Sequence, residues 1–92
     1  MAEQFGRNLK RARGRAGISQ EELAAITDLH RTAIGLLERG SRLPRLDTII
    51  KLSGGIDVPN VVLISGMRWH PGAHRRGGFY VEGEPARTMR QP

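Results

Sequence analysis

Apolar side chains recur at helical spacing along the first two thirds of the chain. Phe5, Leu9 and Ala12 are spaced at i, i+4 and i+7, and the positions around them are mostly polar or basic. Shorter segments downstream continue this period and are separated by glycine, proline and polar residues. The pattern predicts five helices, at 2–16, 19–27, 31–38, 46–53 and 60–65.

Local start and stop signals support these boundaries. The stretch "SQEE" is a capping box, in which the Ser19 hydroxyl accepts from the Glu22 amide and the Glu22 carboxylate accepts from the Ser19 amide. Asp28 tolerates the left-handed conformation that a tight turn after the second helix needs. Gly40 is expected to end the third helix, and "GGIDVP" at 54–59 is expected to break the fourth.

Each predicted helix contributes side chains to a shared core. A chain of 92 residues suggests a single small domain. We assign it to residues 1–67, followed by a C-terminal extension at 68–92 that is rich in Gly, Pro and Arg and holds three of the four aromatic residues. The expected inward positions are Phe5, Leu9, Ala12, Leu23, Ala24, one of Ile26 and Thr27, Ala33, Ile34, Leu37, Leu46, Ile49, Ile50 and Leu52.

The composition narrows the class of protein. A net charge of +6 and a pI of about 11.3 predict attraction to polyanions, namely DNA, RNA or an anionic membrane surface. The chain has no cysteine, and no apolar run approaches the length of a membrane span. The basic N-terminus also lacks the apolar segment of a signal peptide, so we expect a cytoplasmic protein without membrane association.

The two short helices predicted at 19–27 and 31–38 are separated only by a tight turn. This is the size and spacing of a helix-turn-helix, whose second helix lies in the DNA major groove. Ile34 and Leu37 would hold that helix to the body of the protein. Positions 31, 32, 35 and 36 are then free to face DNA.

The stretch "SQEELAAITDLHRTAIGLLERGSRLPRLDTIIKLSGGIDV" resembles the Cro/cI-type (XRE-like) helix-turn-helix family. The motifs that carry the resemblance are "SQEELA", "I-x-x-LERG", "R-x-P-x-LDT" and "KL" before Ile-Asp-Val, in the family's order. With the arginine-rich first helix, the similarity covers about residues 5–65. It implies an all-α, five-helix, lambda-repressor-like DNA-binding domain that acts as a transcriptional regulator of double-stranded DNA, commonly as a homodimer on two-fold operators.

The resemblance also implies which residues contact DNA bases. Arg31 suits a bidentate pair with guanine, whereas Leu36 can meet only a thymine methyl group. A glycine inside a helix costs about 0.5–1 kcal/mol relative to alanine, so Gly35 either allows a close approach to DNA or contacts nothing. The expected base-contacting residues are Arg31, Thr32, Gly35 and Leu36.

Further roles follow from the same resemblance. Arg13 and Glu38 match a family pair that forms an ion pair beneath the motif. His30 stands where the family often has an N-capping Ser or Thr, so the helix start is expected to be loose, with His30 free to touch a phosphate. The expected phosphate contacts are Gln20, His30, Arg39, Arg42 and Arg45.

The extension lies outside the resemblance. Phe79–Val81 is a run of β-formers between glycines, and we expect a short strand that packs on the last two helices or pairs with a second chain. The alternative is a partly ordered tail in which Trp69 closes the core. The "HRR" run at 74–76 would add phosphate contacts.

The sequence also allows other interpretations. The arginines, Arg31 included, would then form an ordinary solvated basic surface. Leu36 or the aromatic tail would bind a partner protein in an antitoxin- or adaptor-like complex, or the chain would be a protein-interaction module that has lost DNA binding. A membrane-surface role has only the basic first helix in its favour. His70 and His74 are too loosely spaced, without a third ligand, to predict a metal site. We expect no catalytic residues and no cofactor.

Overall fold

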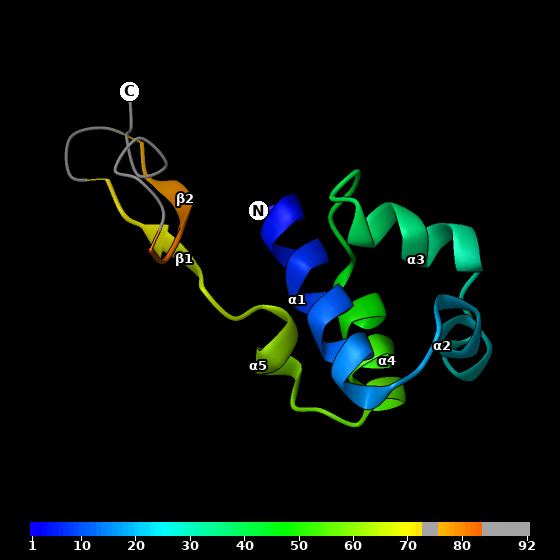
Figure 1. Cartoon of the computed structure of the whole chain (residues 1–92). Helices are drawn as coiled ribbons and strands as arrows, with labels where there is room; N and C mark the ends of the chain where they lie inside the picture. The colour runs from blue at the N-terminus through cyan, green and yellow to red at the C-terminus, as the bar shows by residue number, and fades with distance from the viewer. Residues whose placement is uncertain (73–75, 84–92) are drawn as a thin grey trace.

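The computed structural model describes residues 1–72 and 76–83, which form a helical body and a projecting β-hairpin (Figure 1). In Figure 1, α1 crosses the body, with the α2–α3 pair on one side of it and α5 and the hairpin on the other. No helix in this part of the chain combines the length and apolarity that a membrane span requires. In chain order the elements are α1 (Ala2–Ala16), α2 (Gln20–Thr27), α3 (Arg31–Glu38), α4 (Leu46–Ile56), α5 (Asn60–Leu63), β1 (Met67–His70) and β2 (Gly78–Val81).

The helix ends that the sequence predicted are confirmed. The Ser19 hydroxyl accepts from the Glu22 amide at 3.0 Å, and the Ser19 amide donates to the Glu22 carboxylate at 2.7 Å, which completes the capping box. Asp28 ends α2 in the left-handed conformation, with φ of 58°. Gly40 follows α3 at φ of 75°, and its amide donates to the Leu37 carbonyl at 3.1 Å. A glycine fits this cap because it adopts a positive φ without steric cost.

The core lies where α1 meets the other helices. The predicted inward positions of α1, α2 and α3 are largely correct, with Ala33 only half-buried. The sequence pattern missed Ile56 and Leu63, which complete the core from the last turn of α4 and from α5. The buried apolar residues are Phe5, Leu9, Ala12, Leu23, Ala24, Ile34, Leu37, Leu52, Ile56 and Leu63.

The sequence predicted that the fourth helix breaks at its glycine pair, and this prediction is wrong. It continues through Gly54 and Gly55 to Ile56, and Asp57 ends it in the left-handed conformation. A Cβ atom at Gly55 would lie 2.7 Å from the Thr27 side chain, so the glycine lets α4 pack closely against α2. This tertiary contact outweighs the low helix propensity of glycine.

The predicted inward face of α4 was also partly wrong. Leu46 is 74% exposed and Ile50 is 51% exposed, because the buried stripe of α4 consists of Leu52, Ser53 and Ile56 with the half-buried Ile49. On α2, Thr27 is buried and Ile26 is exposed, which settles the alternative left by the sequence. The fifth helix ends at Leu63, earlier than predicted.

The expected strand at Phe79–Val81 is confirmed as part of β2, but its partner is β1 of the same chain. The two strands pair antiparallel with Trp69 opposite Phe79, and the two rings meet edge to face at 4.9 Å between centroids. Neither α4 nor α5 covers this hairpin (Figure 1). Trp69 is 53% exposed and therefore does not close the core, whereas Met67 packs partly against it.

Close contact between α1 and α3 depends on Gly6. A Cβ atom at this position would lie 2.6 Å from the backbone oxygens of both Leu37 and Glu38. Real Cβ atoms do not approach carbonyl oxygens so closely, so a larger residue must push the two helices apart. Gly14, on the same helix, has open space around it.

These two glycines make a matched pair for mutagenesis. We expect Gly6→Ala to lower the free energy of unfolding by about 1–3 kcal/mol through overpacking. We expect Gly14→Ala to raise it by about 0.5–1 kcal/mol through helix propensity. Urea unfolding followed by circular dichroism measures both. If Gly6→Ala stabilised the protein as much as Gly14→Ala, the close contact between α1 and α3 would be wrong.

Candidate nucleic-acid interface

The α2–turn–α3 unit presents one side of α3 outward. Ile34 and Leu37 are buried and attach α3 to the core, and Leu29 in the turn packs partly against the same core. Arg31 and Thr32 at the start of α3 are exposed. The first turn of α3 is therefore available to a partner, while its opposite side is fixed by packing.

A buried ion pair fixes the position of α3 on the side that faces α1. The Arg13 guanidinium of α1 makes two bonds to the Glu38 carboxylate of α3, at 2.6 and 3.0 Å. Its remaining nitrogen donates to the Ile18 carbonyl at 2.9 Å, and the Gln20 amide of α2 donates to Glu38 at 3.0 Å. Side-chain exposure is only 16% for Arg13 and 4% for Glu38. We call this network, Arg13, Glu38 and Gln20, the buried bridge; it joins α1, α2 and α3.

The buried bridge keeps Glu38 ionised. Burial alone would raise the pKa of Glu38, but hydrogen bonds from Arg13 and Gln20 and the charges of Arg13 and Lys10 lower it below its ordinary value. The hydrogen bonds that Arg13 donates to Glu38 raise the pKa of Arg13 in turn. Both partners are therefore charged across the physiological pH range.

A polar hollow of about 200 Å³ brings together several residues that the sequence singled out. Gln20 lies at one edge, where its amide already donates to Glu38, so its expected phosphate contact stays a prediction. Gly35 is buried beneath the Arg39 side chain, because a Cβ atom there would lie 3.2 Å from a guanidinium nitrogen of Arg39. Arg39 must move aside before DNA can approach Gly35. The hollow is lined by Gln20, Arg31, Thr32, Gly35 and Arg39.

The other expected contact residues do not line this hollow but are close to its residues in sequence. Leu36 is half-buried, and His30 is exposed and caps α3 by its backbone without a side-chain bond. Arg42 is exposed in the loop after α3, and Arg45 lies 3.5 Å from the Asp47 carboxylate in a fully solvated pair. A pair so exposed contributes little to stability, which leaves Arg45 available to another anion.

Two further expectations concern the extension. Arg76 of the "HRR" run is exposed, whereas the other two residues of the run, at 74 and 75, lie outside the described residues. His70, which the sequence did not predict to bind a metal, lies on β1, and the other histidine of that pair, at 74, is also outside the described residues. Within residues 1–72 and 76–83, no group of three potential ligands gathers around a metal position.

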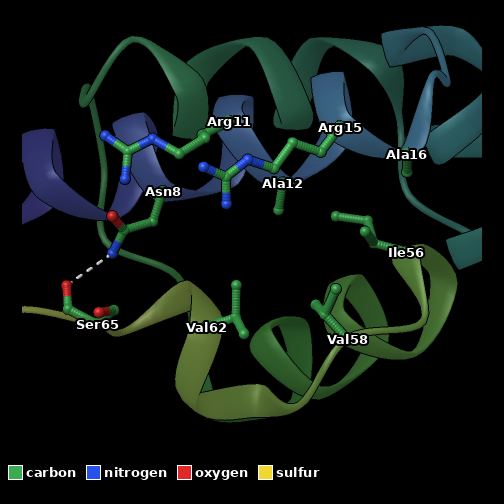
Figure 2. Close-up of a pocket in the computed structure, with 9 residues that line it drawn as sticks. All are labelled: Asn8, Arg11, Ala12, Arg15, Ala16, Ile56, Val58, Val62 and Ser65. Atoms are coloured by element: carbon green, nitrogen blue, oxygen red, sulfur yellow. Dashed lines mark hydrogen bonds between the residues drawn. The ribbon is translucent and has the colours of Figure 1, made fainter.

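Sequence reasoning missed one structural residue, Asn8. Its amide group donates to the Ser65 carbonyl at 2.9 Å (Figure 2) and to the Leu63 carbonyl at 3.0 Å. Its carbonyl accepts from Gln4. These bonds tie α5 to α1 on the side of α1 away from α3. An Asn between Phe5 and Leu9 on the inward face was the available signal, since a buried amide needs partners.

The buried bridge predicts a pH-dependent stability. We expect Glu38→Gln to lower the free energy of unfolding at neutral pH by about 1.5–3 kcal/mol, because it weakens charge-assisted hydrogen bonds. The folded-state pKa of Glu38 lies below 4.5, so the carboxylate stabilises the fold fully above pH 4.5 and loses this effect as the pH falls through the lowered value.

The measurement is urea unfolding of wild type and variant from pH 7 down to pH 3. Glu82→Gln is the matched control, because its partner Arg68 and Glu82 itself are more than half exposed. We expect this control to change stability by less than about 0.5 kcal/mol. A Glu38→Gln difference that stayed constant over the acid range would contradict a lowered pKa for this carboxylate.

Comparison with known proteins agrees with this geometry. A family model described as helix-turn-helix (HTH_3) matches residues 9–59, more than half of the chain. The control protein C.BamHI of Bacillus amyloliquefaciens is 44% identical over 55 residues, covering 59% of this chain and 68% of the relative. The control protein C.SmaI of Serratia marcescens is 37% identical over 68 residues, covering 72% of this chain and 81% of the relative.

A solved structure is similar over the same region. The restriction-modification controller protein C.AhdI from Aeromonas hydrophila aligns with a TM-score of 0.66 and 37% identity, over 67% of this chain and 94% of that chain. The family match ends before α5 and the hairpin. Fold, motif and relatives thus agree, and the chain belongs to the helix-turn-helix family of DNA-binding transcriptional regulators.

Proposed function

We propose that this protein is a controller-type regulator that places α3 in the major groove of an operator. The observation that carries the proposal is the exposed start of α3, with Arg31 and Thr32, above an ion pair that holds the helix in place. The relatives named as control proteins and as a restriction-modification controller support a role in regulating restriction-modification genes. Such a role requires specific DNA binding and no catalysis.

The proposed DNA contacts are of two kinds, those to bases and those to phosphates. Base contacts come from Arg31 and Thr32, with Leu36 against a thymine methyl group and Gly35 at the closest approach, after Arg39 has moved. A ring of polar and basic groups around them contacts phosphates and sets the orientation of α3. This ring consists of Gln20, His30, Arg39, Arg42 and Arg45.

We also propose that the protein acts as a homodimer through its α4–α5 side. Leu46 and Ile50 are exposed one turn apart on α4, and α4 contacts α5, whose Val61 is 62% exposed. Exposed apolar side chains concentrated on neighbouring elements are typical of an association surface. A homodimer would place two copies of α3 on successive turns of DNA.

The direct test is selection from a random duplex DNA library at near-physiological salt. We expect an inverted repeat whose half-sites lie about one helical turn apart. A single asymmetric half-site would contradict the homodimer and indicate a monomer or a missing partner protein. No enrichment, together with salt-insensitive background binding, would contradict specific DNA binding itself.

Base and phosphate contacts are distinguished by two variants. We expect Arg31→Ala to weaken binding by about 1–3 kcal/mol and to relax the preference at one base pair. We expect Arg42→Ala to weaken binding equally on all sequences and to reduce the slope of log affinity against log salt by about 1. Arg15→Ala is the control, because Arg15 lies on the α5 side of α1 (Figure 2). Equal losses on every sequence for Arg31→Ala would make Arg31 a phosphate contact.

A charged substitution on α4 tests the proposed dimer surface. Ile50→Glu places a carboxylate on the exposed side of α4, so we expect a folded monomer in sedimentation experiments. Ile26→Glu is the matched control, because Ile26 is also an exposed isoleucine, at 57%, but belongs to α2. If Ile50→Glu sedimented like wild type, the dimer would have to use a different surface.

A further inference from the structure

A pocket of about 440 Å³ lies between α1 and α5, on the side of α1 away from α3 (Figure 2). Its interior is apolar: Ala12 and Ile56 are buried core residues, and Val58 and Val62 form the opposite wall. The pocket exists because alanines on this face of α1 leave space opposite the short α5. Its volume is in the range of small-molecule sites.

The polar groups of the pocket are of two kinds. Asn8 closes one end, and its amide is already satisfied by the carbonyls of Leu63 and Ser65, so it is a structural group. Arg11 and Arg15 lie along the opening, and Figure 2 shows both side chains running back along α1 above the pocket. The pocket therefore combines an apolar interior with two positive charges at its entrance.

In the part of the chain that the structure describes, these two arginines form no ion pair. They stand four residues apart on one face of α1, where like charges repel each other. Arg13, between them in sequence, points to the other side and pairs with Glu38. Within residues 1–72 and 76–83, neither Arg11 nor Arg15 has a carboxylate within salt-bridge distance.

We propose that this pocket binds a small organic anion: a carboxylate, sulfonate or phosphate carried on an apolar aromatic or branched aliphatic body. The acid group accepts hydrogen bonds from the guanidinium groups of Arg11 and Arg15, which present planar donors suited to such anions. The apolar body contacts Ala12, Ile56 and Val62. The site is separate from the exposed face of α3, so its test needs no DNA and does not depend on the proposed DNA contacts.

The test uses a fluorescent probe of this class, anilinonaphthalene sulfonate, on the full chain at near-physiological salt. We expect saturable binding of one probe per chain, with amide and methyl NMR shifts at Ala12, Val58 and Val62. The neutral counterpart phenylnaphthylamine, which lacks the sulfonate, is expected to bind about tenfold more weakly or worse, because it loses charge-assisted hydrogen bonds.

Two variants assign the binding to this pocket. Arg11→Gln with Arg15→Gln is expected to weaken probe binding by about tenfold or more. Arg7→Gln with Lys10→Gln removes two charges from the same helix outside the pocket and is expected to leave binding unchanged. Ala16→Phe fills the mouth of the pocket from an exposed position and is expected to abolish binding while the far-ultraviolet spectrum stays the same.

Three results would overturn the proposal. The first is equal probe binding by wild type and the Arg11→Gln, Arg15→Gln variant. The second is NMR shifts confined to the exposed aromatic pair of the hairpin or to Leu46 and Ile50, which would indicate ordinary hydrophobic adsorption. The third is unchanged binding by a folded Ala16→Phe variant. If Ala16→Phe failed to fold, the arginine variants would still decide, because both arginines are exposed and their substitution leaves the core intact.

Discussion

The Glu38 carboxylate is almost completely buried, and the arrangement of the first three helices depends on how its charge is satisfied. An unpaired charge in such a place would cost several kcal/mol, so Arg13 must come from α1 and Gln20 from α2 to the last turn of α3. The close contact at Gly6 brings α1 near enough for this pairing. The outward face of α3 is thus set by the groups beneath it, which suits a helix that must fit a groove of fixed width.

α1 separates two surfaces of different character. On one side it supports α3 through Gly6 and Arg13. On the other side Asn8 ties it to α5, and alanines leave a hollow under two arginines. Positive charge therefore lies both on the surface that we propose contacts DNA phosphates and on the rim of a small apolar pocket. A single basic helix serves both because neighbouring residues on a helix point to different sides.

Features that depend on neighbouring residues in the sequence were predicted most accurately. The capping box at Ser19 and the glycine at 40 depend only on residues close in sequence, and both were predictable. Gly55 was misjudged because its helical state depends on contact with Thr27 of another helix. Ile50 was misplaced because apolar periodicity does not show which apolar positions of α4 face the core. β1 was missed because its pairing with β2 crosses a loop outside any local pattern. The expected DNA-contacting residues were named from the family resemblance. The pocket between α1 and α5 was not predictable, because it arises from small side chains on separate elements and corresponds to no sequence motif.

The central claim is that the outward face of α3 contacts DNA while the opposite side of α1 does not. It is tested most directly by amide NMR titration of the full chain with the duplex recovered by selection. We expect the largest changes at Arg31, Thr32 and Leu36 and in the loop at 41–45, with little change at Arg11 and Arg15. Changes confined to α5 and the hairpin, with an unperturbed α3, would contradict it.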